Sequence, residues 1–245
     1  GGTTRAADRA ASAALGRAQR GGGGDGLAVL GAAERDLDLP RSRKLVGGIR
    51  TIDQRELETL RLVTREGGSR VPTTGGVLLF GTDRERYFPD AGVRAARFKG
   101  TDRRVFIDSR DFTGALPVQI EQAMEFTQRH IARRIEIGRT KHEVRWKYPL
   151  EAVREAVTNA VVHADYSQPG AGIRIAIFDD RIEIDNPGSL LPGLTIGQVL
   201  GGVSKLRNRV IGRTFRELRL IEQWGSGVGR MVSACREAGL PDPLL

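Results

Sequence analysis

The sequence predicts an α/β fold in which a strand-rich middle region, about residues 67–147, precedes a sandwich of helices on a mixed sheet. Two observations carry this prediction. The stretch from Leu150 to His163 has apolar residues at helical spacing, with Pro149 just before it, where a missing N–H costs nothing. The runs Gly172–Phe178 and Arg181–Ile184 then alternate apolar and polar residues, which is the period of a strand. Asp179-Asp180 between the runs predicts a tight hairpin turn.

The middle region reads as short strands followed by one long helix. Val77–Phe80 is a continuous apolar run bounded by glycines, which predicts a strand buried on both faces. Further expected elements are strands at Val93–Phe98 and Val105–Ile107, an amphipathic helix over Gly114–Ile137, and a strand over Glu143–Tyr148. Outside this region, helices are expected over residues 5–20, Asp53–Thr64, Asn208–Leu220 and from the Gly225–Gly229 segment to about Ala238.

Charge is unevenly distributed along the 245 residues. The net charge is +9, and all of the excess lies in residues 1–150, because residues 151–245 carry equal numbers of basic and acidic side chains. A basic part of this kind is a candidate footprint for nucleic acid, although a scattered arginine bias gives the same total. No apolar run approaches the ~20 residues of a membrane span, and the single cysteine excludes an intrachain disulfide. We therefore expect a cytoplasmic protein.

The helix expected at Leu150–His163 carries three polar residues on one face. Glu155, Asn159 and His163 stand at i, i+4 and i+8, while the valines between them line another face. The amide oxygen of Asn159 is a suitable ligand for Mg²⁺ alongside phosphate oxygens. Glu155, one turn away, could orient or deprotonate a water molecule as a general base. The alternative interpretation is an ordinary solvated helix face.

Two further motifs could take part in ligand binding. Asp185 stands at the end of a strand, where its carboxylate can accept a hydrogen bond from an exocyclic amine, and the turn at Pro187-Gly188 lets a flat ring approach the backbone. The run Gly225-Ser226-Gly227-Val228-Gly229-Arg230 opens a helix, where glycine N–H groups and the helix N-terminus favour phosphate. A helix rather than a strand precedes these glycines, and the sequence contains no Walker A motif.

The order of these motifs resembles the Bergerat-type ATP-binding fold of the gyrase, histidine kinase and MutL (GHKL) superfamily. The resemblance assigns Asn159 to Mg²⁺, Glu155 to the general base and Asp185 to adenine. It assigns Gly225, Gly227 and Gly229 to the phosphates, with Gly188, Ser226, Arg230 and His163 as further residues of the ATP site. The segment from Ser189 to Trp224 would then form a mobile lid.

A closer resemblance is to the RecG-related transcriptional regulators that carry a Schlafen/AlbA-type nucleic-acid-binding domain. It rests on the string Glu155–Tyr166, on Asn186-Pro187-Gly188, on Arg207-Asn208 and on residues 72–81. The sequence differs from that family at Ala164, where Arg is usual, and at Arg209, where Pro is usual. The resemblance implies that residues 1–66 are the tail of a preceding domain plus a helical linker. Residues 67–147 would be an α/β middle region, and residues 148–245 the ATP-binding module with its last strand truncated.

These observations favour an ATP-binding transcriptional regulator, in which nucleotide binding alters DNA binding or assembly. Two alternatives stay open: a Mg-dependent ATPase with Glu155 as general base, and a non-enzymatic scaffold whose nucleotide pocket has decayed. The expected partners are ATP with Mg²⁺, DNA through the basic residues 1–150 or flanking domains, and a second copy of the chain in a homodimer. No membrane association is expected.

Overall fold

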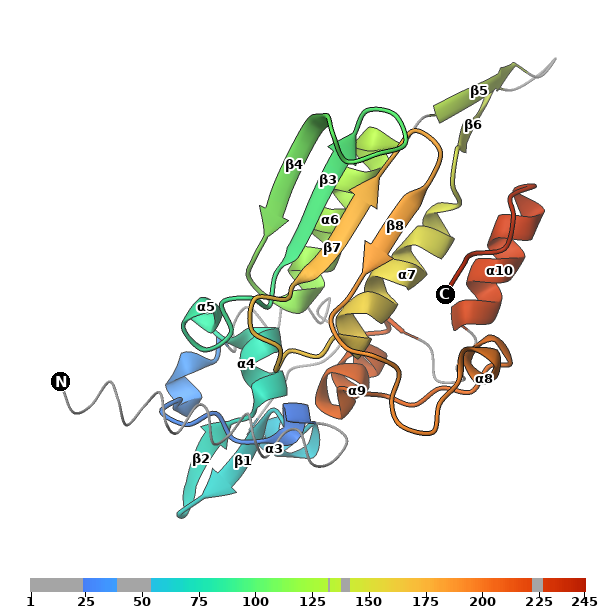
Figure 1. Cartoon of the computed structure of the whole chain (residues 1–245). Coiled ribbons are helices and arrows are strands. Elements are labelled where there is room, and N and C mark those ends of the chain that lie inside the picture. Colours follow the sequence, from blue (N-terminus) through green and yellow to red (C-terminus); the bar gives the residue numbers. More distant parts are fainter. Residues whose placement is uncertain (1–23, 39–53, 132, 138–141, 222–226) are drawn as a thin grey trace.

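A four-stranded mixed sheet forms the centre of the molecule (Figure 1). The structure is a computed structural model that describes residues 24–38, 54–131, 133–137, 142–221 and 227–245. The sheet has the order β4-β3-β7-β8, with β3 parallel to β7 and the other neighbours antiparallel. Its strands are β3 (Val93–Phe98), β4 (Phe106–Phe112), β7 (Ile173–Ile177) and β8 (Ile182–Asp185). The mixed α and β content confirms the predicted fold class.

Two helices cover one face of this sheet, and they form the main core with it (Figure 1). They are α6 (Leu116–His130) and α7 (Leu150–His163). Alternate residues of β7, Ile173, Ile175 and Ile177, are buried beneath them, as the strand period predicted. The helix at Leu150–His163 and the hairpin of β7 and β8 are therefore confirmed. Because β3 and β4 lie in the same sheet as β7 and β8, the sheet is continuous across the boundary expected between residues 147 and 148.

The other elements surround this sandwich. On the amino-terminal side they are η1 (Gly24–Gly26), η2 (Glu34–Asp36), α3 (Gln54–Thr59), β1 (Val63–Glu66), β2 (Ser69–Pro72), α4 (Thr74–Phe80) and α5 (Arg84–Tyr87). The later ones are β5 (Arg133–Ile137), β6 (His142–Trp146), α8 (Ile196–Leu200), α9 (Arg209–Glu217) and α10 (Gly227–Glu237). The helix predicted over residues 5–20 falls outside the described residues. Within the described residues, no helix is long and apolar enough to cross a membrane.

The strand predicted at Val77–Phe80 is wrong, because these residues belong to α4. The Thr73 hydroxyl accepts a hydrogen bond from Gly76 N at 3.0 Å and caps the helix. A Cβ at Gly76 would lie 2.0 Å from the carbonyl oxygen of Leu62, so only glycine allows the helix to approach this closely. The helix is buried on every side and has no polar face, so its sequence cannot be distinguished from that of a buried strand.

Two predicted helices are shorter than expected. The helix predicted over Gly114–Ile137 ends at His130, and Arg133–Ile137 forms β5, which pairs with β6. The chain turns to extended backbone at Ile131, whose side chain is buried in the core. The helix predicted over Asp53–Thr64 ends at Thr59, because Arg61 takes a left-handed conformation with φ 58° and leads into β1. The strand expected at Val105–Ile107 begins one residue later, at Phe106, and extends to Phe112 as β4.

Asp25 of η1 fastens the amino-terminal part of the chain to α9. This carboxylate is buried and accepts hydrogen bonds from the backbone N–H groups of Arg209, Val210 and Ile211 at 2.7–3.0 Å. These are N–H groups of the first turn of α9, which have no partner within the helix. Burial raises the pKa of Asp25, and the three N–H groups oppose that rise. A proline at 209 would remove one of these donors, so the arginine at this position is consistent with the capping role of Asp25.

We expect Asp25→Ala to lower the free energy of unfolding by about 2–3 kcal/mol, because it leaves the buried donors at the start of α9 without an acceptor. Chemical denaturation with urea measures the difference. Asp83→Ala is the matched control, since Asp83 occupies the N-cap position of α5 but makes no capping hydrogen bond there. Equal effects of the two substitutions would contradict this role for Asp25.

Candidate functional site

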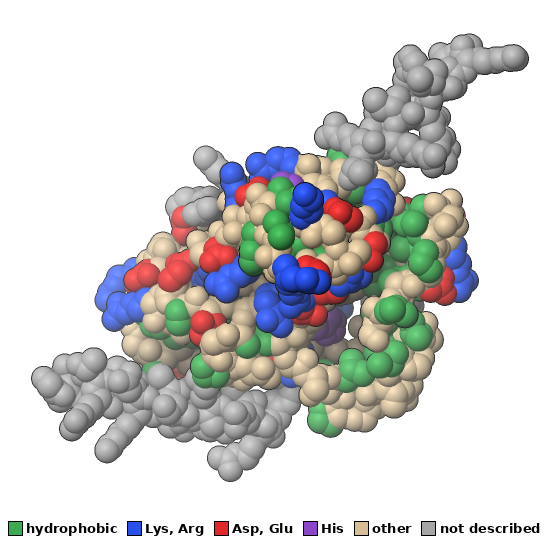
Figure 2. All heavy atoms as spheres, turned by 45° about the horizontal axis from the view of Figure 1, so that its top comes forward, with side chains coloured by type: hydrophobic (Ala, Val, Ile, Leu, Met, Phe, Trp, Pro, Cys, Tyr) green, Lys and Arg blue, Asp and Glu red, His purple; other side chains and the backbone are tan. Residues whose placement is uncertain are grey.

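A large cavity opens beside the edge strand β8. It has a volume of about 1030 Å³ and lies between α7, β8, α10 and the segment 189–206. Sites for small ligands are typically ~300–1000 Å³, so the space suffices for a nucleotide. Figure 2 shows the molecule hollowed beside the lobe at the lower right that contains α8. The cavity is lined by most of the residues that the sequence singled out, namely Glu155, Asn159, His163, Asp185, Gly188, Gly227 and Arg230.

One face of α7 forms the floor of the cavity. Glu155, Asn159 and His163 face it from successive turns, while Val157 and Val161 on the opposite side are buried in the core. This division of the helix into two faces follows from the spacing in the sequence. Burial and the guanidinium of Arg207 lower the pKa of His163, so its imidazole is neutral at pH 7.

Both carboxylate oxygens of Glu155 accept hydrogen bonds. Asn159 Nδ2 donates to Oε1 at 3.1 Å, and the Arg230 guanidinium donates to Oε2 at 2.8 Å. A Cβ at Gly227 would lie 1.9 Å from Oε1 of Glu155, so the start of α10 rests directly against this carboxylate. The glycine at 227 therefore serves a close approach between α10 and α7, and the sequence alone gave no sign of that contact.

The residues present are compatible with a magnesium ion bound through phosphate. Because Asn159 uses its Nδ2 for Glu155, its amide oxygen is left without a hydrogen bond among the described residues. Mg²⁺ commonly takes one or two protein oxygens and completes its shell with water and phosphate oxygens. Within the described part of the chain, no three His, Cys, Asp or Glu residues are grouped to hold a metal by themselves. Such an ion would therefore arrive with the nucleotide.

The turn after β8 is packed against the end of α7. Gly188 has φ +102°, and a Cβ there would lie 2.9 Å from Cβ of Asp165 and 3.3 Å from the Arg207 guanidinium carbon. Asp165 N also donates to the Pro187 carbonyl at 2.8 Å. Only glycine fits this backbone conformation and this space. Asp185, which precedes the turn, is half-exposed at the rim of the cavity, with Arg103 and Arg174 each 3.9 Å away.

Arg207 and Asn208 hold the end of α7, which explains the pair that the sequence showed without a role. Asn208 Nδ2 donates to the carbonyls of Val162 and Ala164 at 2.9 and 2.7 Å. Arg207 donates to the carbonyls of His163, at 3.0 Å, and of Ser189. The carbonyls of Val162, His163 and Ala164 are at the end of α7 and have no partner within the helix. Ala164 is fully buried beneath this junction.

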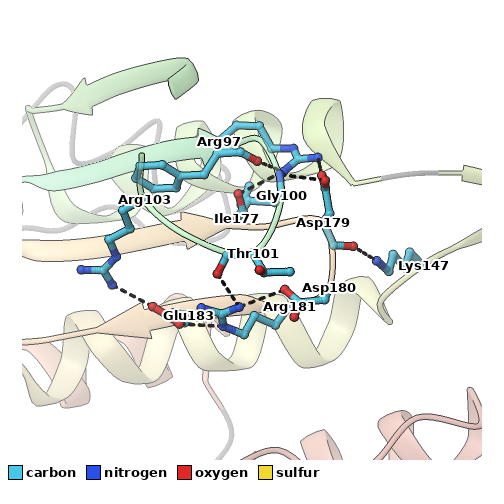
Figure 3. Close-up of polar contacts among 11 residues, drawn as sticks. Arg97, Gly100, Thr101, Arg103, Lys147, Ile177, Asp179, Asp180, Arg181 and Glu183 are labelled. Carbon is cyan, nitrogen blue, oxygen red and sulfur yellow. Dashed lines mark hydrogen bonds and ion pairs between the residues drawn. The ribbon is translucent and has the colours of Figure 1, made fainter. Parts of the chain in front are cut away.

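At the other end of the cavity, a network of ion pairs joins the β7–β8 turn to the β3–β4 loop (Figure 3). Asp179 accepts hydrogen bonds from Arg97 and from Gly100 N, and its carbonyl accepts one from Lys147. Arg103 adds an ion pair to Glu183 at 2.7 Å. The network fixes the residues that lead into α7.

Tyr148 is a candidate site residue that the sequence did not reveal. It lines the cavity directly before α7, and its buried hydroxyl has no hydrogen-bond partner among the described residues. Burial raises the pKa of Tyr148, so the hydroxyl keeps its proton at neutral pH. A tyrosine before a proline gives no distinguishing signal in the sequence.

The glycine-rich run is only partly described. Gly225 and Ser226 fall outside the described residues, whereas Gly227 and Arg230 line the cavity from α10. Gly229 is exposed on α10 and does not line the cavity.

The expected lid also differs from the prediction. Of the segment from Ser189 to Trp224, α9 packs into the core through Val210, Ile211 and Phe215. Among the described residues of this segment, 189–206 remain as a covering segment, with half-exposed apolar side chains at Leu190, Ile196, Leu200 and Val203.

The fold and the cavity define an α/β protein with a ligand-sized cavity beside an edge strand. Residues 170–245 match the HATPase_c_4 family, described as "Putative ATP-dependent DNA helicase recG C-terminal". Residues 170–245 are thus similar to an ATPase-like domain, which suggests ATP binding. No curated protein matches the chain.

The crystal structure of the DIP2311 protein from Corynebacterium diphtheriae is similar to this structure, with a TM-score of 0.73 and 20% sequence identity. The similarity covers 89% of this chain and 44% of that chain. It shows the shared fold alone, and this chain spans less than half the length of that protein.

We expect Gly227→Ala to destabilise the protein by about 1–3 kcal/mol, because its Cβ would overlap the Glu155 carboxylate and force α10 away from α7. Thermal or urea unfolding measures the change. Gly229→Ala is the matched control on the same helix, since a Cβ there meets no atom within 4 Å. That control should be neutral or more stable by up to ~1 kcal/mol. A stable Gly227→Ala protein would contradict the contact between these helices.

Proposed function

We propose that the chain binds Mg-ATP in the cavity beside β8 and uses the bound nucleotide as a regulatory signal. One observation carries this proposal. Motifs that lie up to 75 residues apart in the sequence, from Glu155 to Arg230, face one cavity of nucleotide size. The family match of residues 170–245 supports the same interpretation.

Each part of a nucleotide has a suitable partner in this cavity. Asn159 would provide an amide oxygen to Mg²⁺, and Arg230 with the N-terminus of α10 would meet the phosphates. Asp185 and the turn at Gly188 would receive the adenine ring, with its exocyclic amine donating to the carboxylate. His163, neutral at pH 7, can donate or accept one hydrogen bond at the cavity floor. The apolar side chains of residues 189–206 would cover the base.

Regulation follows from the position of Arg230. In the structure this guanidinium pairs with Glu155 and so joins α10 to α7. A phosphate group carries more charge than one carboxylate, and it would compete with Glu155 for the arginine. Binding would then shift α10 and the covering segment together. The basic excess in residues 1–150 supports nucleic acid as the partner that senses this change, in keeping with transcriptional regulation.

The test is thermal unfolding of the chain with and without Mg-ATP, because a ligand that binds only the folded state must stabilise it. At a hundred times the dissociation constant the gain is ~2.7 kcal/mol. We expect this gain in the parent, little or none in Asn159→Ala, and the full gain in Gln128→Ala. Gln128 is the matched amide control on α6, away from the cavity.

A shift of equal size in the parent and in Asn159→Ala would contradict the proposed site. No shift in any of the three proteins would contradict ATP binding by this chain and favour the alternative of a scaffold with a decayed pocket.

A Mg-dependent ATPase is the second candidate function, and the contact between Glu155 and Asn159 on one helix face favours it. Glu155 could act as a general base only after Arg230 has left it, because both of its oxygens are engaged. If this candidate is right, Glu155→Gln should lower the turnover number by ~10²-fold or more while ATP still binds. The measurement is the rate of phosphate release by the parent and by the variant. Equal turnover numbers would show that Glu155 is not the general base.

A further inference from the structure

Strand β4 forms an open edge of the central sheet. The order β4-β3-β7-β8 gives it one neighbour, β3, and no other described strand pairs with it (Figure 1). Its residues are exposed except at Asp108, which is half-buried, and at Phe112, which is buried. Ile107, at 55%, is among the most exposed large apolar side chains of the described residues. An exposed edge of this length offers a row of backbone donors and acceptors to an added strand.

We infer that β4 pairs with β4 of a second copy of this chain, antiparallel, about a two-fold axis through Ser109. This register follows from charge. Residues at equal distances from the axis lie opposite each other, so Arg110 of each copy faces Asp108 of the other, twice in the dimer. Ile107 lies opposite Asp111. Opposite charges directly across an antiparallel pair are stabilising, and like charges are destabilising.

Registers centred on a charged residue of β4 place like charges together. An axis through Asp108, Arg110 or Asp111 sets that residue opposite its own copy. An axis through Ile107 uses only the irregular end of the strand, where the pairing with β3 shifts between Arg97 and Phe98. The charges of β4 therefore favour the axis through Ser109 over axes through Asp108, Arg110 or Asp111.

Asp108 and Arg110 carry the opposite charges that this pairing requires. The hydrogen bond between Asp108 and His130, at 2.9 Å, holds the pKa of Asp108 below its usual value, so its carboxylate is negative. Arg110 makes no hydrogen bond or ion pair with another described residue, and its side chain is exposed. The groove between β4 and α6 adds Arg129 and Glu125, which again combine both signs of charge.

The helices beneath the sheet allow the approach. Pairing of two β4 strands places the two β3 strands three strand spacings apart, about 14 Å. Helix α6 packs against β3 and β4, so the two copies of α6 would lie near that separation. Helices in contact are ~8–10 Å apart, so the backbones do not clash and side chains of the groove can fill the space. Strand β4 is one edge of the sheet, and β8 with the cavity is at the other edge. The inference therefore does not depend on nucleotide binding.

The test is a charge exchange between two variants, followed by sedimentation equilibrium and native mass spectrometry. Arg110→Asp places Asp opposite Asp108, and Asp108→Arg places Arg opposite Arg110, so each variant alone repels its own copy. Each should weaken the dimer by about tenfold or more. Mixed together, the two variants restore both opposite-charge pairs and should form a heterodimer, which the mass difference identifies.

Arg35→Asp is the control, because it makes the same change of charge at an exposed position on η2 and should leave the dimer intact. Circular dichroism shows whether each variant is folded, and Arg110→Asp keeps the test valid if loss of the contact to His130 unfolds Asp108→Arg. Three results would overturn the inference: a parent that stays monomeric up to about 100 µM, a dimer unaffected by Arg110→Asp, or two folded variants that form no heterodimer when mixed.

Discussion

The geometry of the candidate site depends on the junction between the end of α7 and the start of α9. Asn208 satisfies two carbonyl groups at the end of α7, and Arg207 satisfies a third. Asp25 satisfies the N–H groups at the start of α9 from the far end of the chain. The carbonyl and N–H groups at these two helix ends have no partner within their own helix. The hydrogen bonds from Asn208, Arg207 and Asp25 therefore fix the positions of α7 and α9 with respect to the turn at Gly188. The cavity floor and the covering segment meet at this junction.

A second constraint acts at the opposite wall, where α10 meets α7. The ion pair between Glu155 and Arg230 is largely shielded from water on the glutamate side, which is 15% exposed. A partly buried carboxylate needs a compensating charge, and the arginine of α10 supplies it. The position of α10 is thus coupled to the charge in the cavity. An anionic ligand changes that charge, which gives the site a physical means of transmitting its occupancy.

The sequence predicted those parts of the fold in which a periodic pattern faces a single core. Helix α7 and the strands β7 and β8 belong to this class, and so do Glu155, Asn159 and His163 as one face of a helix. Helix α4 was mistaken for a strand because complete burial removes the polar face that reveals a helix. Contacts between residues far apart in the sequence could not be predicted from a local pattern. Asp25 lies 184 residues before Arg209, and Gly227 touches Glu155 only because α10 packs against α7.

The most direct test of a regulatory nucleotide site is hydrogen–deuterium exchange of the chain with and without Mg-ATP. The account predicts slower exchange in residues 185–206 and at the start of α10, where the ligand and the displaced arginine would act. The amides of β4, at the other edge of the sheet, should exchange at the same rate in both states. Unchanged exchange around the cavity at saturating nucleotide, or protection confined to another part of the chain, would contradict the central claim.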